Sequence, residues 1–513
     1  MSIERGSLTI IRIKMIRFSL IILLLTTIVQ ATPKPNVLFI SVDDMNDWAS
    51  PLGGYPGKVH TPNMERLGKL GVTFLNAHTA SPVCCPSRTA IMLGLRPSTT
   101  GIYNNGQWWR PHLPDTVSIP MYFRQHGYKA IGAGKVFHHT AGFNPPDQWD
   151  DFQRLVFKDD PWFRGNKLNY PWSMHKKKPS GYPFSGLKDT PHEGDWGAIP
   201  GLIEINYDDS RTVDYAVEVL KEKHKKPFFL ACGIFRPHLP WYAPRKYFEM
   251  YPINKIELPE TPEDDLQDIP TQGRKLSASR RSEFLNIKKH GKWKEAIQAY
   301  LASISFADAQ LGRLLETLDK SIHKNQTIIV FWSDHGWHLG EKNHWHKSTL
   351  WEEATRIPFI ISVPGMTKGG THCYHPVDTL SIYPTLIELC GLKAKKNLDG
   401  VSIAPLLADP QMPWDTPAIT EFKRGQCAVR SIRYRYIRYS DGTEELYDHS
   451  KDPNEWTNLA SNSEHSETIK NLSRSIPNKF ASDAPSKGSY EFDPKKYVWT
   501  HRKTGKITSG NKR

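Results

Sequence analysis

The 513-residue chain lacks most of the features that mark a specialised structural class. Its six cysteines are too few for a disulfide-built scaffold of this length. It shows no internal repeat, no long low-complexity run, no closed zinc-binding pattern and no nucleic-acid-binding motif. These absences leave a globular protein, long enough for one large domain and a smaller one, and we expect no nucleic-acid partner.

The N-terminus carries the pattern of an export signal. Arg12, Lys14 and Arg17 precede the twelve-residue apolar run FSLIILLLTTIV, and the small residue Ala31 follows. This order of basic, apolar and small residues predicts a signal peptide over 1–31. A membrane anchor is the alternative, but the apolar core is short for a span, and no later stretch is long enough. We expect an exported protein without a membrane partner after cleavage, periplasmic or extracellular in a bacterium, or lysosomal in a eukaryote.

The chain is strongly basic. Its formal net charge is +14, and removal of 1–31 takes away four positive charges and one negative charge, which leaves +11. A basic exported protein favours anionic ligands, although a solvated basic surface explains the same excess.

Apolar strands alternate with helical segments along much of the chain. PNVLFISVDD, YKAIGAGKVFHH, PFFLACGIFRPH and TIIVFWSDHG each run apolar and then turn polar, and RIPFIISVPG is a further strand. Helices are expected over 213–224, 296–318 and 380–389. Strand–helix alternation predicts an α/β fold with a large, mostly parallel sheet flanked by helices.

The pattern changes near residue 411. CAVRSIRYRYIRYSDGTEELYDHS alternates like antiparallel strands, with a turn at Asp441–Gly442. We therefore expect a large domain over 32–410 and a smaller α+β domain with an antiparallel sheet over 411–513, ending in a flexible basic tail over 501–513. The segment 108–196, rich in tryptophan and proline, is expected to form long loops, either a substrate rim or ordinary surface.

Polar side chains follow four of the predicted strands. They are Asp43 and Asp44, Lys135 and His138, His238, and Asp334 and His335. Because the carboxyl ends of parallel strands meet at one edge of a sheet, these side chains are expected to form one site. Adjacent Asp43 and Asp44 repel each other and need a cation. With Asp334 they offer hard oxygen ligands, which suit Ca²⁺ or Mg²⁺.

The stretch SPVCCPSRTAIMLG adds a cysteine to this site. Pro86 marks the start of a helix, and a helix N-terminus attracts anions. Arg88, Lys135 and Lys347 supply further positive charge. With an oxygen-ligated cation, this set predicts a site for a tetrahedral oxyanion, either sulfate or phosphate. A plain thiolate at Cys84 is one candidate nucleophile.

The segment CCPSRTAIMLG resembles the C-x-P-S-R signature of the type I sulfatases, with Cys85 at its variable position. SVDDMND, GKVFHH, FRPHLPW, SDHGWHLGEKNHWHKSTLWEE and ELYDHSKDPNEWTNLA resemble further elements of that family. His335, where many sulfatases have asparagine, is similar to the iduronate-2-sulfatase branch. The resemblance implies an alkaline-phosphatase-like α/β fold, and oxidation of Cys84 to formylglycine (3-oxoalanine) by a formylglycine-generating enzyme.

The resemblance also implies roles for the matching residues. One Ca²⁺ would be bound by Asp43, Asp44, modified Cys84, Asp334 and His335. Charge on the sulfuryl oxygens would be stabilised by Arg88, Lys135 and Lys347. His238 would be the general acid for the leaving alcohol, and His138 would assist deprotonation of the second hydroxyl of the hydrated aldehyde, the one that does not attack sulfur. Substrate would contact Lys135, His238, Lys347 and Trp337, whereas His344 and His346 receive no role.

The expected activity is hydrolysis of sulfate esters of carbohydrates, by an exo-acting, iduronate-2-sulfatase-like enzyme on 2-O-sulfated uronic acid. Three alternatives stay open at this point. They are a sulfatase for another polysaccharide such as an algal galactan, a phosphoester or phosphonate hydrolase of the same superfamily, and a non-catalytic protein that binds sulfated glycans.

Overall fold

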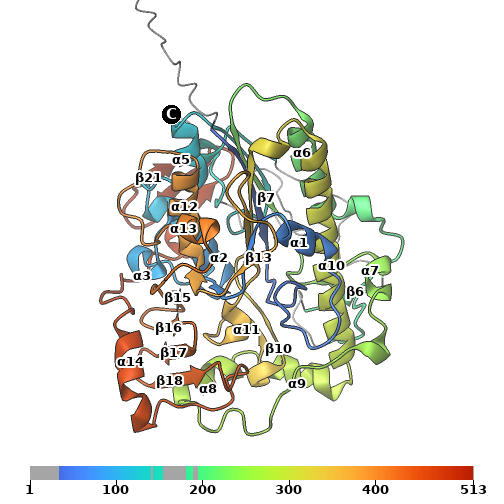
Figure 1. The fold of residues 1–513 in the computed structure, drawn as a ribbon, viewed down its shortest axis with the longest axis vertical. Helices are drawn as coiled ribbons and strands as arrows, with labels where there is room; N and C mark the ends of the chain where they lie inside the picture. Colours follow the sequence, from blue (N-terminus) through green and yellow to red (C-terminus); the bar gives the residue numbers. More distant parts are fainter. Residues whose placement is uncertain (1–33, 140–141, 154–180, 189–193, 512–513) are drawn as a thin grey trace, which may run out of the picture. The chain divides into compact units, whose positions relative to one another are not determined.

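The computed structural model describes residues 34–139, 142–153, 181–188 and 194–511. The predicted signal peptide, 1–31, lies outside the described residues, as does much of the segment 108–196. Residues Pro35–Arg513 form one compact unit (Figure 1), and the domain boundary near residue 411 stays a prediction. No helix in the described ranges is both long and apolar enough to cross a bilayer.

An eight-stranded sheet forms the centre of this unit. Only β12 among its strands runs antiparallel to its neighbours; the other adjacent pairs are parallel. In spatial order the strands are β13 Thr371–Cys373, β2 Val72–Phe74, β12 Phe359–Ser362, β9 Thr327–Ser333, β1 Asn36–Val42, β7 Phe228–Gly233, β4 Lys129–Gly134 and β5 Asp151–Gln153. The predicted α/β fold with a mostly parallel sheet is confirmed.

Both faces of the sheet are buried. Val37 and Phe39 of β1 belong to one hydrophobic cluster, and Leu38 and Ile40 belong to the other, because successive strand side chains point to opposite faces. Burial on both sides explains why the strand sequences are apolar almost throughout instead of alternating.

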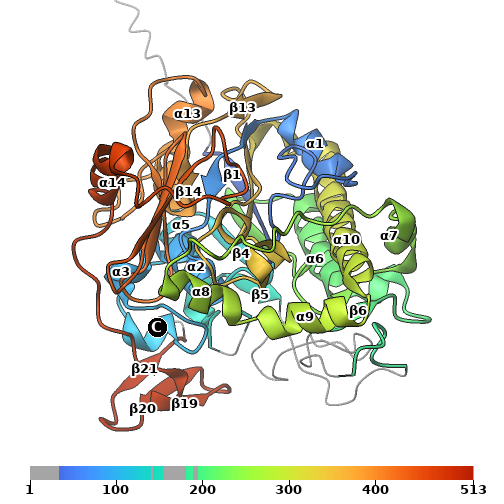
Figure 2. The ribbon, with the colours of Figure 1, turned by 90° about the horizontal axis from the view of Figure 1, so that it is seen from below.

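Helices cover the two faces. On the face of Leu38 lie α6 Asp208–Lys221, α10 Trp293–Lys320 and α1 Pro62–Gly68, and Figure 2 shows α6 beside α10. On the face of Val37 lie α2 Cys84–Leu93, α5 Ile119–Gln125, α12 Ile382–Leu389 and α13 Ala404–Ala408. The helices predicted over 213–224, 296–318 and 380–389 are confirmed as α6, α10 and α12.

Shorter elements connect this framework. The helices are α3 Pro97–Thr100, α4 Trp109–His112, α7 Arg245–Glu249, α8 Thr271–Ala278, α9 Arg281–Lys289 and α11 Glu352–Thr355. Three pairs of two-residue strands are β3 Ala77–His78 with β14 Val377–Asp378, β6 Trp196–Gly197 with β8 Trp241–Tyr242, and β10 His338–Leu339 with β11 Trp345–His346.

Antiparallel strands follow residue 417, as predicted. The strands β15 Ala418–Glu421, β16 Cys427–Arg430, β17 Tyr434–Arg438 and β18 Glu444–Asp448 form a meander, and α14 Ser466–Ser473 contacts β17. The predicted turn at Asp441–Gly442 joins β17 to β18. Gly442 has φ = 84°, a conformation that favours glycine.

The end of the chain differs from the prediction. The strands β19 Tyr490–Asp493, β20 Val498–His501 and β21 Ile507–Ser509 form a three-stranded sheet. Trp499 is fully buried, and its ring lies 5.1 Å from Phe492 and 6.4 Å from Trp108. The prediction of a flexible tail is therefore wrong for residues 501–511, because aromatic packing holds this short sheet in place.

Candidate active site

Four neighbouring parallel strands place their carboxyl ends at one edge of the sheet. In the order β9, β1, β7, β4 they are followed by Asp334 and His335, Asp43 and Asp44, His238, and Lys135 and His138. The register aligns Val42 with Ser333, and Gly233 with both Ser41 and Gly134, so the four ends lie at one level. The predicted convergence of these side chains is what the structure shows.

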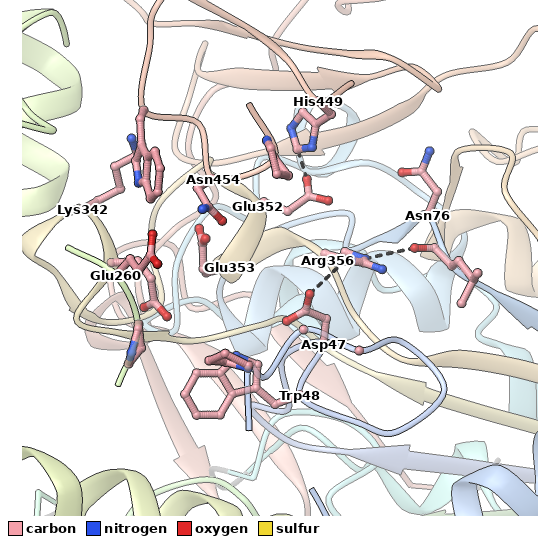
Figure 3. A pocket seen from close by; sticks show the side chains of 18 of the residues that line it. Asp47, Trp48, Asn76, Glu260, Lys342, Glu352, Glu353, Arg356, His449 and Asn454 are labelled. Atoms are coloured by element: carbon pink, nitrogen blue, oxygen red, sulfur yellow. Dashed lines mark hydrogen bonds and ion pairs between the residues drawn. The ribbon is translucent and has the colours of Figure 1, made fainter. Parts of the chain in front are cut away.

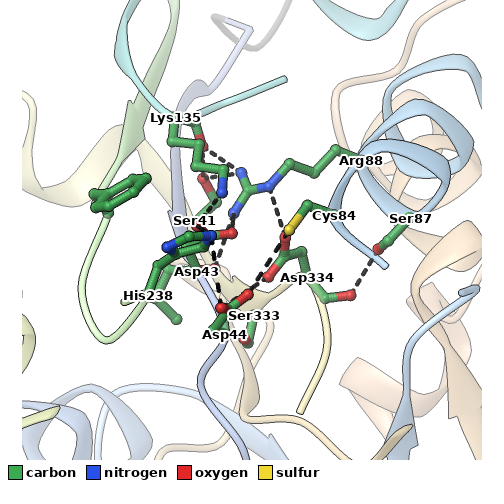
Figure 4. A network of polar contacts seen from close by, with 12 residues as sticks. Ser41, Asp43, Asp44, Cys84, Ser87, Arg88, Lys135, His238, Ser333 and Asp334 are labelled. Carbon is green, nitrogen blue, oxygen red and sulfur yellow. Dashed lines mark hydrogen bonds and ion pairs between the residues drawn. The ribbon is translucent and has the colours of Figure 1, made fainter. Parts of the chain in front are cut away.

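Cys84 is the first residue of α2 and reaches the same edge. The backbone N–H of Cys85 donates to Asn105 Oδ1 at 2.9 Å, which holds the start of the helix. Cys84 Sγ accepts from Lys347 Nζ at 2.9 Å and lies 3.3 Å from His335 Nε2 and 3.8 Å from Asp44 Oδ1. Figure 4 shows the thiol among the carboxylates that follow β1 and β9.

Arg88, one turn after Cys84, joins two carboxylates from different strands. Its Nε donates to Asp334 Oδ2 at 2.8 Å, and its Nη2 donates to Asp43 Oδ1 at 3.0 Å. All three side chains have no exposed surface. The guanidinium also donates to the carbonyls of Val42, Lys135 and Val136. Arg88 thus binds the start of α2 to the sheet edge (Figure 4).

Two lysines bring positive charge from outside α2. Lys135 Nζ donates to Asp43 Oδ2, and Lys347 Nζ donates to Asp44 Oδ1 at 2.6 Å. Burial disfavours a charged amine at position 347, but Asp44 and Cys84 outweigh it and raise the pKa of Lys347. Lys347 therefore carries its charge directly beside the thiol.

The carboxylates of the site repel one another. Burial, with Asp334 nearby, raises the pKa of Asp43, and burial raises the pKa of Asp44 to about 8. Burial also acts on Asp334, but there Arg88 and His335 prevail and lower its pKa. Three buried carboxylates so close together require more positive charge than the side chains supply at Asp43 and Asp44.

A hard divalent cation fits these residues. Asp44 Oδ2 is buried and accepts no hydrogen bond from the described residues. His335 Nδ1 donates to the Gly336 carbonyl at 3.0 Å, so Nε2 presents its lone pair to the carboxylates. Possible ligand atoms lie within 4.8 Å of one another in two overlapping sets, Asp43–Asp44–Cys84–His238 and Asp44–Cys84–Asp334–His335. Carboxylate oxygens with one imidazole suit Ca²⁺ or Mg²⁺.

Two further histidines of the predicted set are His238 and His138. His238 Nε2 is 3.7 Å from Asp44 Oδ2 and 4.0 Å from Asp43 Oδ2, while its Nδ1 donates to the Leu239 carbonyl at 2.6 Å. Burial, together with Lys135, lowers the pKa of His138 well below its usual value. A neutral His138 is able to accept a proton.

A cavity of about 280 Å³ opens over the thiol. Five of its lining residues belong to the predicted set: Cys84, His138, His238, Trp337 and Lys347. The other predicted residues do not line the cavity but form the charged network beside it: Asp43, Asp44, Asp334, His335, Arg88 and Lys135.

Sequence reasoning missed five residues that line this cavity: Asn105, His139, Leu239, Arg280 and His346. Arg280 stands between α8 and α9, in a stretch without a motif, so only the tertiary fold brings it to Cys84. His346 received no role in the sequence analysis, because its signal was one histidine among several near Lys347.

A larger cavity, about 930 Å³, lies elsewhere among the described residues (Figure 3). Its charged residues are largely paired with each other: Asp47 with Arg356 at 3.0 Å, Lys342 with Asp265 at 2.5 Å and Arg430 with Glu352 at 3.3 Å. Glu352, His449 and Glu455 are close enough to hold a metal ion, but Arg435 already pairs with both carboxylates. We therefore interpret this region as a structural ion-pair network.

Comparisons with known proteins identify the family to which the chain belongs. The family model described as Sulfatase matches residues 35–392, and the model described as N-sulphoglucosamine sulphohydrolase, C-terminal, matches residues 340–481. A protein named Sulfatase from Formosa agariphila is 41% identical over 469 residues, covering 90% of each chain. Human iduronate 2-sulfatase is 32% identical over 446 residues, covering 82% of this chain and 76% of its own.

A solved structure shares the fold. The phosphonate monoester hydrolase of Silicibacter pomeroyi aligns with a TM-score of 0.69 at 21% identity, covering 86% of this chain and 94% of its own. At this identity the likeness concerns the fold alone.

Proposed function

Because the chain belongs to the sulfatase family, we propose that it hydrolyses sulfate esters of carbohydrates with the side chain at position 84 as nucleophile. The resemblance predicted from the sequence is confirmed by these relatives, and the chain is a sulfuric ester hydrolase. The finer proposal is an exo-acting enzyme on 2-O-sulfated uronic acid, supported by the likeness to human iduronate 2-sulfatase.

The observation that carries the proposal is the position of Cys84. Its sulfur lies 2.9 Å from Lys347 Nζ and 3.3 Å from His335 Nε2, at the start of a helix whose Arg88 binds Asp43 and Asp334. We propose that a formylglycine-generating enzyme oxidises Cys84 to an aldehyde, which is then hydrated. One geminal hydroxyl attacks sulfur and releases the sugar alcohol, and the other hydroxyl then loses its proton, so that the aldehyde re-forms and sulfate is expelled.

The proposed metal is one Ca²⁺, held by Asp43, Asp44, Asp334, His335 and the modified residue 84. When bound, it would neutralise the carboxylates and polarise the sulfuryl group as a Lewis acid. Arg88, Lys135 and Lys347 keep fixed positive charge around the sulfuryl oxygens, so little reorganisation is needed as charge develops.

The histidines divide the proton transfers. His138 is buried, and burial and Lys135 hold its pKa below the usual value, so the ring is neutral and can accept the proton of the second geminal hydroxyl as sulfate is expelled. His238 is oriented through Nδ1 by the Leu239 carbonyl, which leaves Nε2 to carry a proton to the leaving alcohol. Trp337 forms the wall of the cavity beside Lys347, with the amine 5.3 Å from the ring centre.

The cavity size supports exo action. About 280 Å³ lies just below the range for small-ligand sites, roughly 300–1,000 Å³, and suits one sugar unit better than an internal chain segment. A phosphonate or phosphoester hydrolase is the second candidate, because the charged site would also accept a tetrahedral phosphate, and an aryl phosphate in the assay tests it.

Sulfate release tests the proposal. The protein would be produced together with a formylglycine-generating enzyme and given disaccharides sulfated at uronate O2, hexosamine O6, hexosamine N or galactose O4, plus an aryl phosphate. We expect release from the 2-O-sulfated uronate. Release from galactose sulfate alone would support the sulfatase reaction but exclude the uronate as the substrate. Phosphate release without sulfate release would exclude sulfate ester hydrolysis as the reaction.

A further inference from the structure

We propose that Arg280 binds the carboxylate of the uronic acid whose 2-O-sulfate is cleaved, and so determines the sugar that the enzyme selects. This inference rests on the proposed function. Arg280 and Lys347 are the two arginine or lysine side chains among the described residues that line the cavity over Cys84.

The two cations are placed for different tasks. Lys347 is engaged with Asp44 and Cys84 at the base of the cavity, and its side chain is 13% exposed. The Arg280 side chain lines the same cavity but is 50% exposed, and its ion pair with Glu283 is long at 4.0 Å. Arg280 is therefore available to a second anionic group that lies farther out than the sulfate.

A continuous wall connects the two cations. Lys347 Nζ lies over the ring of Trp337, and the ring of His346 lies 4.4 Å from that of Trp337. His346 Nε2 is 3.0 and 3.1 Å from the two oxygens of Glu283, which in turn faces Arg280. A ligand that lies against this wall meets charge at both ends.

Backbone hydrogen bonds and packing fix the position of Arg280 at the start of α9. Its carbonyl accepts from the backbone N–H of Glu283 at 3.2 Å and from that of Phe284 at 3.4 Å, which fixes the first turn of α9. Phe284 is fully buried and stacks on Trp345 at 5.9 Å. The Glu283 carboxylate is hydrogen-bonded to His346 and lies 4.0 Å from the Arg280 guanidinium. Glu283 therefore does not form a close ion pair with Arg280.

A carboxylate on the same ring as the sulfate matches this arrangement. The cavity takes about one sugar unit, so a second anion must belong to the ring that carries the scissile ester. A guanidinium presents two parallel donors to a carboxylate, and such charge-assisted pairs are stronger than neutral hydrogen bonds. A 2-O-sulfated uronate has one such carboxylate, whereas a neutral sulfated hexose has none.

A binding cycle tests Arg280 apart from turnover. On a Cys84→Ala background, which cannot react, calorimetry would measure the Kd of the 2-O-sulfated uronate disaccharide and of its carboxyl methyl ester. With Arg280 present we expect the acid to bind about 10- to 100-fold more tightly than the ester. With Arg280→Gln the two should bind equally. An acid-to-ester ratio that Arg280→Gln leaves unchanged would overturn the proposal, as would failure of both ligands to bind when Arg280 is intact.

Arg281→Gln is the matched control. Arg281 is exposed, neighbours Arg280, carries the same charge and does not line the cavity. We expect its acid-to-ester ratio to equal that of the unsubstituted protein; an equal loss in both variants would point to long-range charge and would overturn the specific contact. Turnover by the matured protein reports on the proposed function separately, because sulfate release does not enter the binding cycle.

Discussion

Replacing Arg88 with glutamine removes the cation that joins two strand ends to α2. Arg88, Asp43 and Asp334 have no exposed side-chain surface, so the substitution leaves two carboxylates buried and close together. Breaking a buried ion pair by removing one partner lowers the free energy of unfolding by about 3–5 kcal/mol. With two pairs on one guanidinium, we expect a loss near the upper end, about 5 kcal/mol.

This loss converts into a shift of the melting temperature. The entropy of unfolding is roughly 2.1 cal/mol/K per residue, which for the Pro35–Arg513 unit amounts to about 1 kcal/mol/K. A loss of about 5 kcal/mol therefore lowers the midpoint by about 5 °C. Calorimetry at a fixed scan rate, in a chelating buffer, would measure it.

Two further scans sharpen this test. Arg66→Gln removes a surface ion pair in which Arg66 and Asp319 are 38% and 34% exposed, and we expect it to lower the melting temperature by less than about 1 °C. Adding Ca²⁺ should narrow the gap between Arg88→Gln and the unsubstituted protein, because a cation neutralises the same carboxylates. A midpoint for Arg88→Gln within 1 °C of the unsubstituted protein in chelator would refute the reasoning.

Three other substitutions test separate parts of the structure. Asp334→Asn should abolish the rise in melting temperature on adding Ca²⁺, and an equal rise in both proteins would show that Asp334 is no ligand. A Cβ on Gly336 would clash with the Glu353 carbonyl oxygen. Gly336→Ala should therefore displace the preceding His335, lower kcat at least about tenfold, and reduce the free energy of unfolding by about 1–3 kcal/mol. The control Gly488→Ala, whose nearest contact would be 3.6 Å away, should match the unsubstituted protein in both kcat and stability. Arg435→Gln breaks the ion pairs with Glu352, which lines the 930 Å³ cavity, and with Glu455, and should lower the midpoint by about 3–5 °C while kcat/KM stays within twofold. A collapse of kcat/KM in folded protein would give that cavity a catalytic role.

The strand-end residues were predictable because a parallel sheet imposes a simple rule. Asp43, Lys135, His238 and Asp334 each follow an apolar run, and parallel strands bring their carboxyl ends to one edge whatever their order in the sheet. The sequence therefore predicted which side chains meet without predicting the strand order. Cys84 joined them through its motif, and its helix begins at Cys84, two residues before the start predicted at Pro86.

The rest depended on tertiary packing that no local pattern encodes. Arg280 reaches the cavity because Phe284 packs on Trp345, a contact between segments 61 residues apart. Residues 501–513, which include β21, are predicted as a flexible tail from the five positive charges that they carry. This strand is ordered by Trp499, whose ring packs against Phe492 on the adjacent strand and against Trp108, almost 400 residues earlier in the chain. In both cases the decisive partner is remote in sequence.

The two adjacent cysteines allow the most direct test of the central claim, that position 84 carries the nucleophile. Sulfate release from the 2-O-sulfated uronate would be compared for the unsubstituted protein, Cys84→Ala and Cys85→Ala, each produced with a formylglycine-generating enzyme and supplied with Ca²⁺. Both thiols are buried, and Cys85 Sγ is directed to the Gln107 carbonyl at 3.4 Å, away from the site. We predict that Cys85→Ala releases sulfate and that Cys84→Ala releases none. Sulfate release by folded Cys84→Ala would contradict the account.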